Sequence, residues 1–303
     1  MTKIKTDKII GSILGLALGD AFGAPYEGGI LERVLWMFLG TKDGKRRWTD
    51  DTQMSIDVIE SLLEYRAINQ DDLASRFAAS YQYSRGYGPA AAKILKRIRH
   101  GQSWQRANVS VYQDGSFGNG GAMRVAAVGL FFAKESEEEI IKHAHETAII
   151  THSHPLGLEG AGMIALAVAL SFNEQSSQQI IEHLLHHASS PAFTDRLNQT
   201  KKWIEEPHAV SAKMAAKELG NKISASESCV TAIYTALAFR ESSFDEMLAF
   251  IIEMGGDVDT IGAMAGAIWG AARGFSALPE EKLQALEAGE SLQSLAETFA
   301  KVV

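Results

Sequence analysis

The sequence predicts an all-α protein, and three observations support this prediction. Apolar residues recur at helical spacing along most of the chain. Sustained alternation of apolar and polar residues, the pattern of strands, is absent, and the one Asn-Gly pair, at 119–120, lies in a glycine-rich segment. Only 6 of the 303 residues are proline, so few positions break a helix. No stretch has the composition of a linker, and we expect one compact domain over residues 1–303.

The expected helices follow one another in chain order. The clearest spans residues 53–65, where Met54, Val58 and Leu62 recur on one face. Similar patterns predict helices over 72–79, 89–99, 122–132, 137–150, 156–170, 178–188, 227–239, 244–254 and 260–274. The uncharged stretches 160–173 and 260–272 are rich in glycine and alanine, and we expect them to be buried helices.

Composition excludes several classes of protein. Asp and Glu number 37 against 29 Lys and Arg, and the resulting net charge of −8 disfavours nucleic acids and anionic membranes as partners. No apolar run reaches the roughly 20 residues of a membrane helix. The single Cys229 excludes an intrachain disulfide and a multi-thiolate metal site. Three lysines before the apolar run 9–19 resemble a signal peptide, but Asp7 interrupts them and glycines dilute the run, so we expect a cytoplasmic protein.

Glycines and acidic residues gather in four segments. The first, 15–27, predicts a glycine-rich helix that ends in a loop presenting Asp20 and Glu27. For this segment alone, a helix C-cap followed by a solvated glutamate is the simpler interpretation.

The second and third segments resemble each other. They are Trp-Thr-Asp-Asp-Thr at 48–52 and Gly-Gly-Asp-Val-Asp-Thr at 255–260, each directly before an apolar helix. Helix capping explains one such side chain at each start, but not several. An EF-hand is excluded, because its third oxygen ligand and its twelfth position would be Ile261 and Ile268. Crowded carboxylates repel unless cations neutralise them, and five carboxylates including Glu27 suit two Mg²⁺ or Mn²⁺ ions about 3.5–4 Å apart.

The fourth segment is Gly-Ser-Phe-Gly-Asn-Gly-Gly at 115–121, ahead of the helix expected from Ala122. Exposed backbone N–H groups at a helix start bind phosphate. The segment is not a P-loop, because Gly-Lys-Ser/Thr is missing, and not a dinucleotide fingerprint, because no strand precedes it. A tight turn needs one or two glycines rather than four in seven residues, which favours phosphate or diphosphate binding.

The histidines indicate less. Five are expected at the surface, without a carboxylate or cysteine at zinc-site spacing: His143, His145, His183, His186 and His187. His152 lies between two expected helices, where a position facing a ligand and one facing the protein are equally compatible with the sequence. The loop Tyr-Ser-Arg-Gly-Tyr-Gly at 83–88 is a further candidate for a pocket wall.

Four motifs occur in the order of a known family. They are Gly-Asp-x-x-Gly-x-x-x-Glu at 19–27, Thr-Asp-Asp-Thr at 49–52, Gly-Asn-Gly-Gly-Ala-Met-Arg at 118–124 and Gly-Gly-Asp-x-Asp-Thr at 255–260. Together they resemble the ADP-ribosylglycohydrolases of the dinitrogenase reductase-activating glycohydrolase type, over about residues 8–275. The resemblance implies a compact, orthogonal helical bundle, a central cleft with two Mg²⁺ ions, and a hydrolase that releases ADP-ribose from conjugates.

The resemblance also implies roles for individual residues. The metal ligands would be Thr49, Asp50, Asp51, Asp257, Asp259 and Thr260. Glu27 corresponds to the family's mobile acidic residue, the candidate base, and Asp20 would act from beside the metal site. The diphosphate would be held by Gly115, Ser116, Phe117, Gly118, Asn119 and Gly120. His152 would lie beside it, and Ile223 would touch the adenosine end.

The branch of the family can be inferred in the same way. Arg-Gly-Tyr-Gly at 85–88, the segment 115–124 and Glu-Leu-Gly-Asn at 218–221 resemble the branch that cleaves O-linked ADP-ribose. Its substrates include ADP-ribosyl-serine, O-acetyl-ADP-ribose and poly-ADP-ribose, so we expect an ADP-ribosylated protein or small conjugate as partner. Val258 replaces a usual Thr, and the segment between Glu27 and Thr49 is short, which puts activity on the polymer in doubt more than the hydrolysis itself.

Three other functions remain open on the sequence. An arginine-linkage hydrolase would share the chemistry but not the acceptor. A two-metal phosphohydrolase would cut the diphosphate and release AMP. A non-catalytic ADP-ribose binder would use the same residues without turnover.

Overall fold

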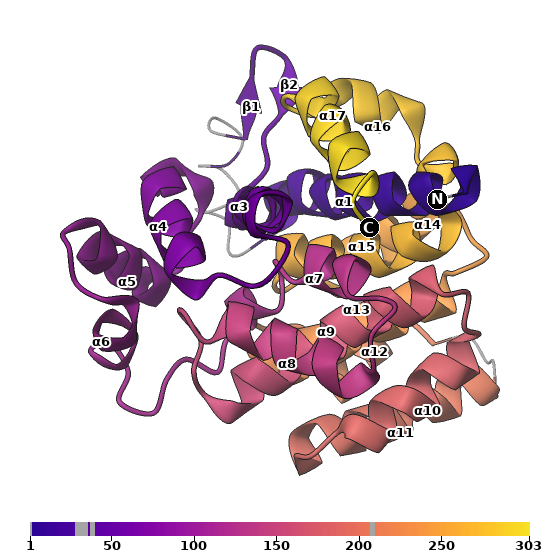
Figure 1. Ribbon diagram of the computed structural model, residues 1–303. Helices are drawn as coiled ribbons and strands as arrows, with labels where there is room; N and C mark the ends of the chain where they lie inside the picture. The colour runs from indigo at the N-terminus through magenta and orange to yellow at the C-terminus, as the bar shows by residue number, and fades with distance from the viewer. Residues whose placement is uncertain (1, 28–35, 37–39, 207–209) are drawn as a thin grey trace.

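The computed structural model describes residues 2–27, 36, 40–206 and 210–303, and α-helices dominate it (Figure 1). The α-helices are α1 Lys3–Gly23, α3 Asp50–Tyr65, α4 Gln70–Ser80, α5 Pro89–Arg99, α6 Trp104–Val109, α7 Ala126–Phe131, α8 Glu137–Ala148, α9 Pro155–Phe172, α10 Ser177–His187, α11 Pro191–Glu205, α12 Ala212–Glu218, α13 Ala225–Ala238, α14 Phe244–Met254, α15 Val258–Arg273, α16 Glu280–Ala285 and α17 Gly289–Ala300. Short 3₁₀ turns cover Ala24–Tyr26, Tyr83–Arg85, Asn119–Gly121 and Phe275–Ala277. The all-α prediction is confirmed.

One small hairpin departs from that prediction. Strand β1, Thr41–Lys42, pairs antiparallel with β2, Lys45–Arg46. The turn between them is Asp43-Gly44, and both residues have positive φ, 52° and 76°, as a type I′ turn requires. The Asp-Gly pair was the available signal, although each strand is too short to show alternation.

Helices α1 and α15 pack with their backbones in contact, through what we call the glycine interface. It consists of Gly11, Gly15, Gly19 and Gly23 of α1 with Gly262, Gly266 and Gly270 of α15. A Cβ added at Gly19 would collide with the carbonyl of Gly262, and one at Gly266 with the carbonyl of Gly15. Because the two helices run antiparallel, the end of α1 lies against the start of α15, and Gly23 faces Asp259. The glycine interface therefore fixes where two acidic segments meet.

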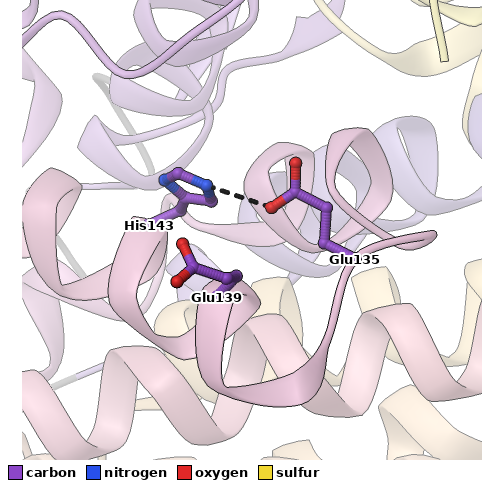
Figure 2. A group of neighbouring side chains, drawn as sticks. All are labelled: Glu135, Glu139 and His143. Atoms are coloured by element: carbon purple, nitrogen blue, oxygen red, sulfur yellow. Dashed lines mark hydrogen bonds and ion pairs between the residues drawn. The ribbon is translucent and has the colours of Figure 1, made fainter.

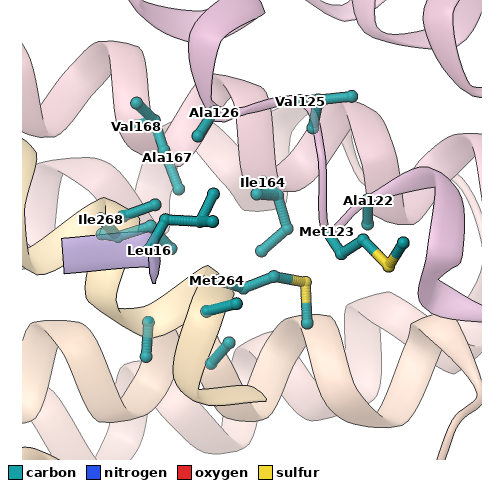
Figure 3. Packing of buried hydrophobic residues seen from close by; sticks show 14 of the residues in the cluster. Leu16, Ala122, Met123, Val125, Ala126, Ile164, Ala167, Val168, Met264 and Ile268 are labelled. Carbon is teal, nitrogen blue, oxygen red and sulfur yellow. The ribbon is translucent and has the colours of Figure 1, made fainter. Parts of the chain in front are cut away.

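The buried core forms around this pair of helices. Leu16 of α1, Ile164 of α9 and Met264 of α15 converge there, with residues of α7 closing one side (Figure 3). The expected burial of segments 160–173 and 260–272 is confirmed by α9 and α15. Two helical segments, Lys3–Tyr26 and Pro155–Phe172, are long and apolar enough to cross a membrane, but 83% of the apolar 18-residue window in each lies buried inside the protein, as in core helices.

Several helix boundaries differ from expectation. Helix α7 begins at Ala126 rather than Ala122, because Asn119–Gly121 forms a 3₁₀ turn and the chain reaches helical geometry only after Val125. Helix α11 was not predicted. It buries only Phe193, Leu197, Thr200 and Trp203 among many polar residues, so its apolar face is sparse. Short helices such as α6 and α12 bury too few residues to show a period.

Candidate active site

A cleft of ≈ 240 Å³ opens between the starts of α3, α5 and α15 and the loop before α7. Eleven of the residues expected in the site line it: Glu27, Asp50, Ser116, Gly118, Asn119, Gly120, His152, Ile223, Asp257, Asp259 and Thr260. Segments that lie far apart in the sequence thus meet in one place. Residues 28–35 and 37–39, most of the short segment expected to carry Glu27, are outside the described residues.

Asp20 lies beneath the cleft and organises the start of α3. It is fully buried, and its carboxylate accepts hydrogen bonds from the Thr49 amide at 2.9 Å, the Thr52 amide at 3.0 Å and the Thr52 hydroxyl at 2.5 Å. Burial raises the pKa of Asp20 to about 6 in spite of these bonds. Asp20 does not line the cleft, so its contribution is to hold the first turn of α3 in place.

The start of α3 presents its polar groups toward α15. Thr49 caps the helix, and its hydroxyl donates to Oδ2 of Asp51 at 2.8 Å. The Thr260 hydroxyl, at the start of α15, donates to the same oxygen at 3.5 Å. The other oxygen, Asp51 Oδ1, is buried and has no hydrogen-bond partner among the described residues. A buried carboxylate oxygen without a partner is costly, and a bound cation would satisfy it.

The start of α15 is held by a different set of contacts. The Asn119 side-chain amide donates to Asp257 and, at 2.9 Å, to the Ser228 hydroxyl. The backbone of Asp259 and Thr260 continues the helix, and Asp259 Oδ1 accepts from the Thr260 amide at 2.8 Å. Asn119 was expected to hold substrate, but in this structure its side-chain donors orient a metal-candidate carboxylate.

The carboxylates of the cleft crowd one another. One oxygen each from Glu27, Asp257 and Asp259 lie within 4.8 Å of one another. Burial, and then the neighbouring negative charges, raise the pKa of Asp50, Asp51 and Asp259 well above the ordinary value. Carboxylate and hydroxyl oxygens suit hard divalent cations, so the residues of this cleft fit a metal ion.

The glycine loop contributes selectively to the cleft. Ser116, Gly118 and Gly120 line it, and Ser116 Oγ accepts from the Gly118 amide at 3.3 Å. Gly115, with a φ of 79°, packs against the backbone of residues 153–154 instead. Phe117 is half exposed and meets the His154 ring edge-on, with ring centroids 5.9 Å apart. Two residues expected to bind substrate, Gly115 and Phe117, are therefore outside the lining.

Some lining residues were not assigned a role from the sequence. Met54, Tyr112, Met123 and Arg124 line the cleft, as do Pro89–Ala91 of α5. Arg124 is the last residue of the motif at 118–124. The available signal in the sequence was a charged side chain within a stretch of small and apolar residues. The loop 83–88 does form part of the wall, through Gly86 and Gly88.

The five histidines expected at the surface lie outside the cleft, but only His186 is exposed, and His143, His145, His183 and His187 are half-buried. Figure 2 shows His143 with Glu135 and Glu139, and His143 Nε2 lies 3.2 Å from a Glu135 oxygen. His143 Nδ1 lies 3.0 Å from Glu146, and its ring stacks on Phe132. Further along, Glu137 contacts His183 and His187 at 2.7 Å each. The carboxylates that contact these histidines lie on α8 or in the turn before it. None of these residues lines the cleft.

Comparison with known proteins agrees with this arrangement. A family model described as ADP-ribosylglycohydrolase matches residues 1–303. ADP-ribosylhydrolase ARH3 of Mus musculus is 33% identical, covering 96% of this chain and 90% of the relative, and the Homo sapiens protein is 32% identical, covering 96% and 92%. An uncharacterised Archaeoglobus fulgidus protein is 32% identical over 96% and 95%.

A solved structure agrees as well. The chain aligns with an ADP-ribosylglycohydrolase-related protein complex at a TM-score of 0.74 and 25% identity, and the alignment covers 99% of both chains. The family match, the relatives and the shared fold lead to the same conclusion. The chain belongs to the ADP-ribosylglycohydrolase family and is a glycosidic-bond hydrolase.

Proposed function

We propose that the protein is an Mg²⁺-dependent hydrolase that cleaves the glycosidic bond of O-linked ADP-ribose conjugates, such as ADP-ribosyl-serine and O-acetyl-ADP-ribose. One observation carries the proposal: the carboxylates at the starts of α3 and α15 meet Glu27 and the glycine loop in a single cleft. The names of the ARH3 relatives support ADP-ribose conjugates as substrates. The choice of an O-linked acceptor depends on the motifs at 85–88 and 115–124.

Two Mg²⁺ ions are the proposed cofactor, with Mn²⁺ as a substitute. Their ligands would come from Thr49, Asp50, Asp51, Asp257, Asp259 and Thr260. When bound, the ions would act as Lewis acids and as a template that orients the distal ribose. Two observations support this assignment: Asp51 Oδ1 has no hydrogen-bond partner among the residues that the structure describes, and the carboxylates repel one another.

Glu27 is the proposed base. Its carboxylate lies among Asp257 and Asp259, where it can accept a proton from the attacking water. The water oxygen then bonds to the anomeric carbon as the bond from that carbon to the acceptor oxygen breaks, and the departing oxygen takes up the proton that Glu27 accepted. The carbon passes through an oxocarbenium-like state. Ser116 and the backbone of the glycine loop would hold the diphosphate, so that binding far from the reacting carbon orients it.

The decisive experiment is a turnover assay with serine-linked, arginine-linked and O-acetyl-linked ADP-ribose, in Mg²⁺ and in excess chelator. We expect release of intact ADP-ribose from the O-linked substrates, no turnover in chelator, and a lower melting temperature there because a ligand bound only by the native state stabilises it. Release of AMP would instead favour the phosphohydrolase, and release from arginine alone would overturn the branch. Full activity in chelator would exclude the metal-dependent mechanism.

A single substitution tests the base. Glu27→Gln should lose turnover on the order of 10²–10⁴-fold, because an amide cannot accept the proton, while ADP-ribose binding persists. Glu139→Gln, on the surface of α8, is the matched control and should keep wild-type rates. Near-normal turnover in Glu27→Gln would remove Glu27 from the mechanism.

A further inference from the structure

His152 presents one ring nitrogen to the cleft and the other to the protein interior. The residue is 8% exposed, and its backbone amide donates to the Ala148 carbonyl at 2.9 Å. Nε2 is the cleft-facing nitrogen: a Cβ added at Gly118 would lie 3.6 Å from it, and one at Gly120 would lie 2.9 Å from it. Nδ1 lies on the other side, 2.8 Å from the hydroxyl oxygen of Thr151.

Thr151 connects His152 to a buried arginine. The Thr151 side chain is almost fully buried, and its Oγ1 lies 3.0 Å from Nη2 of Arg124. Arg124 is itself fixed by the carbonyls of Gly120 at 2.7 Å and Thr147 at 3.1 Å. Three side chains are therefore linked, from Arg124 through the buried Thr151 to His152, and both end members line the cleft.

Donor and acceptor chemistry sets the direction of this chain. A guanidinium only donates hydrogen bonds, so Thr151 Oγ1 accepts from Arg124. Thr151 has one hydroxyl proton, and among the described residues the remaining atom paired with its oxygen is Nδ1 of His152. A protonated Nδ1 would direct two donors at Oγ1 and leave the buried hydroxyl proton without an acceptor, which is unfavourable in a buried site. Nδ1 therefore accepts, and Nε2 carries the proton.

The charge state of the His152 ring agrees with this arrangement of hydrogen bonds. Burial, reinforced by the positive charge of Arg124, lowers the pKa of His152 to about 3. The imidazole is therefore neutral at neutral pH. The position of its single N–H proton decides whether a hydrogen-bond donor or a lone pair faces the cleft.

We propose that Thr151, oriented by Arg124, is a positioning residue that locks His152 in the neutral Nε2–H tautomer, so that the cleft meets a fixed hydrogen-bond donor suited to an anionic oxygen. The other tautomer would present a lone pair to that oxygen and repel it. Identification of the oxygen as part of the ADP-ribose diphosphate rests on the proposed function, whereas the tautomer itself does not.

The first test is long-range ¹H–¹⁵N NMR of the ligand-free protein at neutral pH, with the His152 signals assigned by their loss in His152→Asn. We expect a pyridine-type shift for Nδ1 and a pyrrole-type shift for Nε2. A pyrrole-type Nδ1, or an imidazolium pattern, would overturn the proposal without any reference to substrate.

The second test uses three variants and adds ADP-ribose affinity by calorimetry. Thr151→Val removes the hydroxyl at nearly constant volume, and we expect a mixed tautomer and an affinity loss of about tenfold, the effect of one lost hydrogen bond. Thr151→Ser should restore both. Thr147→Val, the control, removes a buried hydroxyl that donates to the His143 carbonyl instead and should change neither.

The outcomes separate the tautomer from the function. Thr151→Val with an unchanged tautomer would overturn the proposal, as would failure of Thr151→Ser to restore it. A wild type that shows the Nε2–H form but does not bind ADP-ribose would support the tautomer lock and contradict the proposed function. If Thr151→Val does not fold, the wild-type spectrum and Thr151→Ser still decide the question.

Discussion

Glycine meets two different requirements in the two regions that shape the cleft. In the glycine interface of α1 and α15, an added Cβ would strike the backbone of the opposite helix, as at Gly19 and Gly266. In the loop 115–121, the obstacles differ from one glycine to the next: backbone and side-chain atoms of residues 153–154 at Gly115, and side chains alone at Gly120. Gly115 needs its positive φ, and a Cβ at Gly120 would lie 2.7 Å from the His152 ring.

The difference changes how the loop's composition is interpreted. Four glycines in seven residues predicted a phosphate site, but packing within the protein accounts for Gly115, Gly120 and also Gly121, whose Cβ would lie 2.9 Å from Ala148. At Gly118 the nearest atoms are 3.4–3.6 Å from an added Cβ, which is ordinary contact. Gly118 is therefore the position where close approach of a ligand is the remaining reason for glycine.

The largest effect is expected at the glycine interface. Gly19→Ala puts a methyl group against the backbone of Gly262, where neither helix can yield without moving the other. We expect a loss of about 2–3 kcal/mol in the free energy of unfolding, measured by chemical denaturation. The control is Gly88→Ala, where no atom of the described residues lies within 4 Å of the added Cβ, and it should stay within about 0.5 kcal/mol of wild type. Equal stability of both variants would contradict the close packing of α1 and α15.

A smaller and different effect is expected from Gly120→Ala. The methyl group would press on the imidazole of His152, a side chain that can shift, so stability should change little while the cleft-facing nitrogen moves. We expect ADP-ribose affinity to fall about tenfold, the equivalent of one good hydrogen bond. Calorimetry measures the affinity and thermal unfolding the stability. A large stability loss with intact binding would place Gly120 with the glycine interface instead.

The smallest effect should come from Gly118→Ala. Because the protein leaves room for the Cβ, we expect a melting temperature equal to wild type. The methyl group points among Ser116, His152 and Ile223, so ADP-ribose affinity should fall by a few-fold, about 1 kcal/mol or less. Unchanged affinity in the folded variant would remove the reason for assigning the diphosphate to this loop.

The fold could be predicted where helices bury a broad apolar face. Residues 244–254 were predicted and observed as a helix with those bounds, and the helix buries Phe244, Met247, Leu248, Ile251 and Met254. Helix α11 could not be predicted, because its few buried residues are separated by many charged and polar residues. The close approach of α1 and α15 was also missed, although Gly11, Gly15, Gly19 and Gly23 recur at every fourth residue. Spacing shows a glycine face, but only the structure shows which helix covers it.

The motifs of the site could be predicted from the sequence, but the residues that hold those motifs in place could not. The acidic segments 49–52 and 257–260 do begin helices that meet at the cleft, as their similarity indicated. The hydrogen bonds of Asn119 and Asp20 are harder to predict, because a partner more than twenty residues away in the sequence leaves no local pattern. The link from Arg124 through Thr151 to His152 likewise depends on packing between the segments before α7 and after α8, which no spacing encodes.

The antiparallel contact of α1 with α15 also has a consequence for biosynthesis. The ribosome releases α1 early and α15 only after most of the chain has emerged. Until then the glycine face of α1 and its apolar neighbours have no native partner, a state in which nascent chains rely on chaperones. Asp20 and Glu27 are likewise synthesised long before Asp257 and Asp259, so the acidic site is incomplete until then. On the proposed function, we therefore expect the growing polypeptide to gain activity only after translation has passed α15.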